Sequence, residues 1–299
     1  MSLSVGIVGL PNSGKSTLFN ALLSRQIAQV ASYPFTTIEP HEGVVVLPDE
    51  RLDKLAEIVK PEKVTPATVT FIDIAGLVKD AHKGEGLGNQ FLAKIREVDA
   101  IAQVVRVFSN PDVPHVHGKI DPKEDIEIIN LELELAGIKK PTIYVLNTDE
   151  ANSTSVMNFA GIVGEAPLVA ICAKLEMELA ELSPQEGKEY LSQLGIKASG
   201  LEKLIKEAYR ILDLITFYTI KGGEEVRAWS LKTGSNAFEA AGLVHTDFAN
   251  NFIKAEVISF EDLRTADSWK EAQEKGKIRL EGKDYIVQDG DVIEFKVNI

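Results

Sequence analysis

Two kinds of apolar pattern alternate over the first 215 residues of the chain. Short runs rich in β-branched residues are followed by segments whose apolar residues recur at helical spacing. This alternation is typical of a parallel β-sheet that is covered by helices. The predicted strands are 4–9, 43–48, 68–74, 99–108, 141–146 and 166–172, and the predicted helices are 15–24, 50–59, 88–97, 124–136 and 199–213. We therefore expect an α/β domain over residues 1–215.

The pattern changes after about residue 215. Alternating apolar and polar residues predict short strands, with one helix around 236–244, and the strand runs are 216–222, 225–231, 254–260, 277–282 and 284–297. We therefore expect a second, smaller α+β domain over residues 216–299, whose length is within the usual range for a domain.

Composition narrows the class of protein. With 299 residues, of which 44% are hydrophobic, the chain can bury a sizeable core. No apolar run is long enough to cross a bilayer, and the first ten residues lack an export signal, so we expect a cytoplasmic protein without a membrane partner. The one cysteine, Cys172, excludes an intramolecular disulfide and a zinc site built from clustered thiolates.

The charge balance argues against DNA as a partner. The formal net charge is −13, and this would repel a polyanion unless positive charge is concentrated locally. We therefore expect no sequence-specific DNA binding, and any contact with RNA must use a local patch.

The segment "GLPNSGKST", residues 9–17, predicts a phosphate site. It matches G-x-x-x-x-G-K-[ST] and lies between an apolar strand and an amphipathic helix, as this motif requires. Loop amides and the helix N-terminus hold phosphate oxygens, while Lys15 places its charge against the β and γ phosphates. The Ser16 hydroxyl is a candidate ligand of Mg²⁺. The phosphate-binding candidates in this loop are Asn12, Ser13, Gly14, Lys15, Ser16 and Thr17.

Two further segments provide candidate ligands for the metal and the γ-phosphate. The strand in "VTFIDIAGLV" ends at Asp73, a candidate metal ligand, and is followed by Gly76, whose amide can reach the γ-phosphate. In "SYPFTTIEP", Thr36 or Thr37 can supply another metal hydroxyl. Either segment alone would be interpreted as an ordinary turn or loop. Together with the phosphate-loop motif, they indicate a site for the metal and the γ-phosphate.

Several long segments together resemble the Obg-like ATPases of the YchF type. They are "GLPNSGKSTLFNALL", "YPFTTIEP", "DIAGLVKDAHKGEGLGNQFL", "DIEIINLELEL" and "AAGLVHTDFANNFIKAEVISFEDL", and the resemblance covers nearly the whole chain. It implies a P-loop domain of the translation-factor-related GTPase group, followed by a ubiquitin-like β-grasp (TGS) domain. It also implies that Thr37 is the Mg²⁺ ligand, and that a ribosome or ribosomal RNA is the partner.

The segment "NTDE", residues 147–150, bears on the choice of base. A GTP-specific protein has Asn-Lys-x-Asp at this place, and its Asp accepts two hydrogen bonds from guanine. Here the acid is Glu150, one methylene longer, so that contact is moved or lost, whereas the Asn147 amide and the backbone around Thr148 can serve adenine. The resemblance likewise implies a preference for ATP, with Cys172 and Ala173 as small residues packed near the base.

The residue that activates water differs from the Ras-like arrangement. Leu77 stands where Ras-like GTPases have Gln, and leucine cannot hydrogen-bond a water. His82 and His115 are the candidates to replace the Gln. The resemblance favours His115 as the catalytic residue, whereas His117 falls where the family pattern has no histidine.

Three questions stay open from the sequence. Asn12 resembles the asparagine with which some relatives hold K⁺, but it can equally shape the loop. Relatives carry a coiled coil after "DIEIINLELEL", whereas here "AGIKK" leads directly into a strand, in either a natural variant or an edited chain. Finally, a Mg²⁺-dependent ATPase that switches on ribosomes competes with a nucleotide-dependent adaptor of negligible hydrolysis and with a GTP-specific GTPase.

Overall fold

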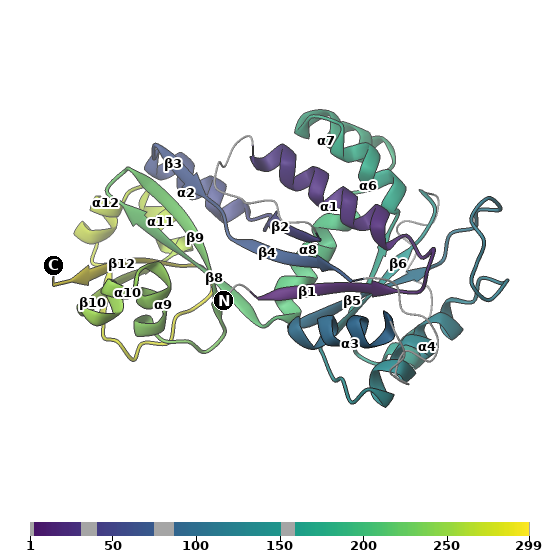
Figure 1. Ribbon diagram of the computed structural model, residues 1–299. Coiled ribbons are helices and arrows are strands. Elements are labelled where there is room, and N and C mark those ends of the chain that lie inside the picture. The colour runs from purple at the N-terminus through teal and green to yellow at the C-terminus, as the bar shows by residue number, and fades with distance from the viewer. Residues whose placement is uncertain (1–2, 31–40, 75–86, 151–158, 299) are drawn as a thin grey trace. The chain divides into compact units, whose positions relative to one another are not determined.

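The computed structural model describes residues 3–30, 41–74, 87–150 and 159–298 (Figure 1). By its contacts the chain divides into two compact units. The first unit consists of Met1–Val46 and Val69–Leu212, and the second of Leu47–Thr68 and Asp213–Ile299.

The first unit is built on a six-stranded sheet. Its strands, in spatial order, are β2 (Glu42–Val46), β4 (Thr68–Asp73), β1 (Ser4–Gly9), β5 (Ala100–Arg106), β6 (Thr142–Asn147) and β7 (Leu168–Ile171). The five strands from β4 to β7 pair in parallel. Their carboxyl ends therefore lie along one edge of the sheet, where ligand sites of open α/β sheets are found.

Helices cover both faces of this sheet (Figure 1). On one face, apolar residues of α3 and α4 pack against β1 and β5 in a buried cluster that includes Val8, Ile95 and Ile129. On the other, α1 lies beside α6 and is joined to α8 by an ion pair between Arg25 and Glu202 at 3.0 Å. The helices of the unit are α1 (Lys15–Val30), α3 (Leu87–Glu97), α4 (Pro122–Leu135), α5 (Ala160–Val163), α6 (Ala173–Ala180), α7 (Pro184–Gln193) and α8 (Gly200–Ile211).

The local sequence explains where α4 begins and how it ends. Asp121 caps the N-terminus by accepting a hydrogen bond from the amide of Glu124, and Pro122 occupies the first turn. Six residues, 136–141, then connect α4 directly to β6, and Gly137 among them has a left-handed φ of 67°. The described residues thus contain no coiled coil between α4 and β6, as expected from the sequence.

The second unit is a mixed α/β unit around another six-stranded sheet. Its strands, in spatial order, are β11 (Arg279–Glu281), β10 (Phe252–Ser259), β12 (Asp291–Val297), β8 (Leu214–Lys221), β9 (Glu225–Lys232) and β3 (Lys63–Thr65). The β8–β9 hairpin is followed by a helix, and β12 returns parallel to β8, which is the arrangement of a ubiquitin-like β-grasp fold. The fold class predicted from the sequence is therefore confirmed. The helices of the unit are α2 (Glu50–Val59), α9 (Ala237–Val244), α10 (Thr246–Asn250), α11 (Phe260–Ala266) and α12 (Trp269–Glu274).

Residues 47–68 differ from the expected domain division. They hold α2 and β3, and they belong to the second unit although they lie far from it in sequence. The guanidinium of Arg51 lies 3.0 Å from Asp49 and 2.7 Å from Asp289, and it stacks over the ring of Tyr218, whose hydroxyl donates to Asp49. Strand β3 pairs with β9, and Arg51 pairs with Asp289. Residues 47–68 therefore contribute a strand to the sheet of the second unit.

No helix in the described part of the chain combines the length and the apolar character that a membrane span needs.

Candidate functional site

The phosphate loop joins β1 to α1, as its motif predicts. Asn12 and Gly14 both have left-handed φ angles, of 63° and 95°. A Cβ on Gly14 would stand 2.0 Å from Nδ2 of Asn147, and one on Gly9 would stand 2.5 Å from the carbonyl oxygen of Val104. Both glycines are therefore required for the close packing of this loop, and at Gly14 the backbone angle adds a second reason.

Lys15 is buried at the start of α1. Its Nζ donates a hydrogen bond to the carbonyl oxygen of Leu10, at 2.8 Å, within the same loop. Burial lowers the pKa of Lys15 to about 8, and the neighbouring charge of Asp73 partly opposes that shift. A desolvated cation held in this way is suited to bind phosphate oxygens, which would replace the carbonyl as its partner.

The structure describes some of the predicted metal ligands but not all of them. Ser16 and Thr17 are exposed at the first turn of α1, and Asp73 is half-buried at the end of β4, close enough to influence Lys15. A hydroxyl and a carboxylate are hard oxygen donors of the kind that Mg²⁺ prefers. Thr36, Thr37 and Gly76 lie outside the described residues. Within the described part of the chain, no group of three or more His, Cys, Asp or Glu could hold a metal by itself.

Ser13 is buried beneath the loop. Its hydroxyl has no hydrogen-bond partner among the described residues, and it points toward β1, where a Cβ on Gly9 would approach it to 2.8 Å. Its carbonyl oxygen accepts a hydrogen bond from Asn147. The side chain of Ser13 thus faces the sheet.

Asn147 connects the phosphate loop to the loop that begins α6. Its Nδ2 donates to the carbonyl oxygen of Ser13 at 2.9 Å, and its Oδ1 accepts from the amide of Ala173 at 3.1 Å. An amide side chain has two N–H groups and two lone pairs on its oxygen. These two bonds therefore leave capacity for a nucleotide.

The other predicted base-binding residues surround Asn147. Thr148 is buried, and its amide donates to the carbonyl oxygen of Ile171 at 2.8 Å. Cys172 and Ala173 are buried as expected of small packing residues. The exposed carboxylate of Glu150 lies 3.8 Å from the ammonium group of Lys174. The structure thus brings the residues of the two segments together at the ends of β6 and β7.

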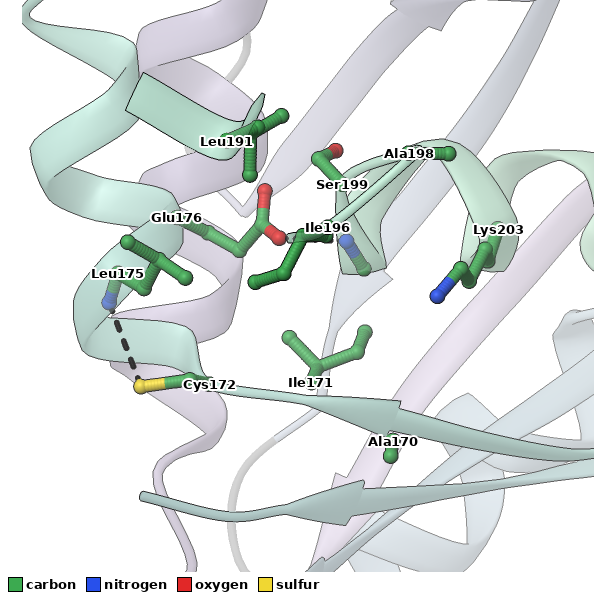
Figure 2. A pocket seen from close by; sticks show the side chains of 11 residues that line it. Ala170, Ile171, Cys172, Leu175, Glu176, Leu191, Ile196, Ala198, Ser199 and Lys203 are labelled. Atoms are coloured by element: carbon green, nitrogen blue, oxygen red, sulfur yellow. Dashed lines mark hydrogen bonds between the residues drawn. The ribbon is translucent and has the colours of Figure 1, made fainter. Parts of the chain in front are cut away.

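Glu176 has a structural role that sequence reasoning missed. Its carboxylate accepts a hydrogen bond of 2.6 Å from the amide of Gly200 at the start of α8. Figure 2 shows this carboxylate reaching from α6 toward Ser199, beside Ile196. Burial raises the pKa of Glu176, while the amides of Gly200 and Leu201 partly oppose this rise. A cavity of about 10 Å³, the size of one water, lies between these elements.

Gly200 is required by that contact. A Cβ there would stand 2.9 Å from a side-chain carbon of Ile171 and 3.1 Å from Oε1 of Glu176. Cys172 caps α6 in the same region, since its sulfur accepts from the amide of Leu175 at 3.5 Å. The end of β7 thus contacts α8 and leads through Cys172 directly into α6.

His115 lies in the loop that follows β5. Its Nε2 is 3.0 Å from Oδ2 of Asp125 on α4, and its Nδ1 accepts from the amide of His117 at 3.2 Å. The side chains of both His115 and Asp125 are only 4% exposed. Both ring nitrogens thus take part in hydrogen bonds. The alternative candidate, His82, lies outside the described residues, as does Leu77.

Arg106 organises the loop that carries His115, and sequence reasoning missed it. This fully buried guanidinium donates to the backbone carbonyls of Phe108, Asn110, Val113 and Pro114 at 2.9 to 3.4 Å. Its Cζ also lies 4.5 Å from the ring centroid of Phe108. An arginine inside the apolar run of a predicted strand was the only available signal.

Asn12 links this loop to the phosphate loop. Its Nδ2 donates to the carbonyl oxygen of Pro114 at 3.0 Å, the same oxygen that Arg106 contacts. This contact supports the loop-shaping interpretation of Asn12. It also places the residue next to His115 directly against the phosphate loop.

Two family models match the chain. Residues 4–148 match the model described as "50S ribosome-binding GTPase", and residues 214–298 match YchF-GTPase_C, described as "Protein of unknown function (DUF933)". The "Ribosome-binding ATPase YchF" of Bacillus subtilis (strain 168) is 44% identical, with 100% of both chains covered. The protein of the same name from Escherichia coli O157:H7 is 42% identical, again with 100% of both covered.

The alignment with the B. subtilis protein includes positions that this chain does not fill. It spans 368 positions against the 299 residues of this chain, a difference of 69, so at least that many residues of the relative have no counterpart here.

Solved structures agree with the sequence relatives. The "Structure of the Schizosaccharomyces pombe YchF GTPase" has a TM-score of 0.86 and 31% identity, and the match covers 99% of this chain and 98% of that one. A GTP-binding protein from Pyrococcus horikoshii OT3, 18% identical with a TM-score of 0.63 over 99% and 100% of the two chains, shares the fold. On this evidence the chain belongs to the YchF family.

Proposed function

We propose that this protein is a Mg²⁺-dependent ATPase that hydrolyses ATP, and GTP less well, and whose nucleotide state controls its binding to ribosomes. The observation that carries the proposal is the phosphate loop, in which Lys15 is buried and Gly14 packs directly against Asn147. The names of the relatives, "Ribosome-binding ATPase YchF", support both the reaction and the partner.

The first unit supplies the residues that hold the phosphates. The loop amides from Asn12 to Thr17 and the start of α1 bind phosphate oxygens, and Lys15 neutralises charge on the β and γ phosphates. The Gly76 amide completes this set. Ser16, Thr37 and Asp73 would hold Mg²⁺, a cation that would supply positive charge to the phosphate groups.

The base site is proposed to favour adenine. Asn147 retains one N–H and one lone pair beyond its bonds to the loop, and these suit N7 and the 6-amino group of adenine. Glu150 has Lys174 nearby at the surface, which does not reproduce the buried carboxylate that a guanine clamp needs. Thr148, Cys172 and Ala173 form the wall of the slot.

His115 is proposed to take up the proton of the attacking water. The contact from Asn12 to Pro114 supports this role because it holds the histidine's loop against the phosphate loop. The hydrogen bonds that engage both ring nitrogens of His115 favour a low basal rate. The same observation favours the second candidate function, a nucleotide-dependent adaptor with negligible hydrolysis until a partner binds.

We propose a nucleotide-binding domain within residues 1–215 and a TGS domain over residues 216–299, with residues 47–68 contributing to the second unit. Residues 47–68 support the second module through β3 and Arg51. We place the contact with the ribosome or its RNA on this TGS module, in the cytoplasm. With a net charge of −13, such a contact must use a local basic or polar surface. In this proposal, Oδ1 of Asn12 would hold a K⁺ ion beside the phosphates.

A single-turnover assay tests the reaction. Purified protein is mixed with limiting ATP and Mg²⁺, and phosphate release is followed with and without ribosomes. We expect slow release that ribosomes accelerate, and we expect none from Lys15→Ala. Release that stays undetectable in both conditions, despite normal ATP binding, would instead establish the adaptor.

A further inference from the structure

The hydrogen bonds of His115 assign its tautomer. Nδ1 accepts a hydrogen bond from the amide of His117, so it carries a lone pair and not a proton. In the neutral ring the proton is then on Nε2, which donates to Oδ2 of Asp125 at 3.0 Å. The side chain is therefore held by the carboxylate on one nitrogen and presents its basic lone pair on the other.

Burying the carboxylate of Asp125 costs folding free energy. It lies in the first turn of α4 with its side chain 4% exposed, and its Oδ1 has no hydrogen-bond partner among the described residues. Asp121 already caps the helix, so α4 does not need Asp125 as its cap. The helix dipole favours a carboxylate in the first turn, but an unpaired buried carboxylate oxygen costs free energy. The hydrogen bond that this carboxylate makes is to His115.

The main chain on the histidine side is fixed independently of Asp125. Arg106 and Asn12 both donate to the carbonyl oxygen of Pro114. The position of residue 115 along the loop is therefore set by these two contacts, whereas the orientation and tautomer of the imidazole are set by Asp125.

We propose that Asp125 is the positioning residue of His115, and that Nδ1 of His115 is the nitrogen that receives the proton of the attacking water. The inference rests on the proposed hydrolytic function and deepens it. As the water oxygen bonds to the γ-phosphorus, its O–H bond breaks and the proton passes to Nδ1. The bond from the γ-phosphorus to the bridging oxygen breaks, and its electron pair leaves with ADP. Asp125 stays ionised and bonded to Nε2–H, where it stabilises the imidazolium.

This step requires Nδ1 to exchange the His117 amide for the water. The bond from that amide is long, at 3.2 Å, and belongs to a turn closed by a hydrogen bond from the amide of Gly118 to the carbonyl oxygen of His115. Gly118 has a φ of 74° and open space around it. A modest change in this turn therefore frees Nδ1 and leaves the bond to Asp125 in place.

The test is a double-mutant cycle of His115→Ala and Asp125→Asn. Single-turnover rates and ATP affinities are measured for the wild type, both single variants and the double variant, with Asp121→Asn as the matched control. Asn caps a helix as well as Asp does, so the control removes a charge from the same turn and keeps the helix. We expect Asp125→Asn to slow turnover about tenfold or more, within the contribution of a positioned general base, with ATP affinity unchanged.

The cycle separates positioning from a general structural effect. If Asp125 acts only through His115, Asp125→Asn causes no further loss in the His115→Ala background. Equal losses in both backgrounds, or a normal rate for Asp125→Asn beside a slow His115→Ala, would overturn the inference and leave the proposed function standing. A normal rate for His115→Ala would overturn the role of His115 and this inference together.

A spectroscopic measurement needs no variant to be active. The chain has five histidines, so ¹⁵N-histidine labelling gives few signals, and His115 is identified by its absence in His115→Ala. We expect the Nε2–H tautomer in the wild type and its loss in Asp125→Asn. An Nδ1–H tautomer in the wild type would contradict the assignment, even if the Asp125 variant fails to fold.

Discussion

The side chain of Asn12 donates a hydrogen bond to the carbonyl oxygen of Pro114 at 3.0 Å. This bond joins the loop of residues 9–17 to the loop that carries His115. Arg106 donates to the same carbonyl. Under the proposed function, this backbone group would couple nucleotide binding to the position of His115.

Asn12→Gly, which keeps the left-handed backbone of this position, should slow hydrolysis about tenfold while ATP affinity changes little, because the loop of His115 loses its contact with the phosphate loop. The rate is measured by single-turnover phosphate release in K⁺ and in Na⁺. If Asn12 acts through Pro114, the loss is the same in both salts. A loss confined to K⁺ would show instead that Asn12 serves the ion.

Gly14→Ala should abolish nucleotide binding and lower the free energy of unfolding by about 3 kcal/mol. The new Cβ would stand 2.0 Å from Nδ2 of Asn147, so Asn147 would have to move and its two hydrogen bonds would be disrupted. Alanine is also disfavoured at the left-handed φ of this position. Urea unfolding and an ATP titration measure the two effects.

Gly137→Ala is the control for that variant. Gly137 also has a left-handed φ, of 67°, but a Cβ there would meet nothing within 4 Å. It should therefore cost only about 1 kcal/mol and leave ATP binding intact. Equal effects of the two substitutions would mean that the contact between Gly14 and Asn147 is unimportant.

Arg106→Lys should destabilise the first unit by about 3 kcal/mol, because one ammonium group cannot serve four carbonyls that the guanidinium now satisfies. Hydrogen exchange of residues 107–118 should accelerate as well. The control is Arg210→Lys, an exposed arginine paired with Glu207 at 2.8 Å, where the change should stay within about 0.5 kcal/mol. Indistinguishable variants would argue against the organising role of Arg106.

The stability contributed by Glu176 should depend on pH in a defined direction. Burial raises the pKa of this carboxyl above its ordinary value of 4.5, so the folded state binds a proton more readily than the unfolded state. Its contribution is therefore fully present below that ordinary value and is lost as pH rises through the folded-state pKa. Relative to Glu176→Gln, the wild type should gain unfolding free energy on going from neutral to mildly acidic pH.

Urea unfolding of the two proteins at several pH values measures this difference. Glu178→Gln on the same helix is the control, since Glu178 is exposed and lies 3.7 Å from Lys174, and its difference from wild type should be small and nearly flat with pH. A wild type that loses stability toward acid relative to Glu176→Gln would reverse the expected sign.

The parts of the fold that follow from local pattern were predictable. All six strands of the first sheet were predicted. The parallel strands β1 and β5 are buried along their whole length because helices cover both faces, whereas burial alternates along β2. The phosphate loop was equally clear, since its motif and its strand–helix context agree. In contrast, β3 has only three residues and no buried side chain, so it becomes a strand only through its pairing with β9.

The missed parts of the site depend on contacts between distant residues. Glu176 contacts Gly200, and Asp125 contacts His115, only once the chain has folded. The hydrophobic periodicity of the sequence does not indicate either pair. The helix α11 was also not predicted, although the sequence contains a helix N-cap pattern at its start. Ser259 and Asp262 have the spacing of an N-cap and the third helical residue, and the amide of Asp262 donates to the Ser259 hydroxyl.

The central claim is that the proposed base site beside Asn147 lacks a carboxylate placed to accept hydrogen bonds from guanine, and that it binds ATP. An equilibrium competition between ATP and GTP for the wild-type protein, with Lys15→Ala as the variant that should bind neither, tests it most directly. We predict that ATP binds at least as tightly as GTP. A preference for GTP of tenfold or more, about 1.4 kcal/mol, would contradict the account.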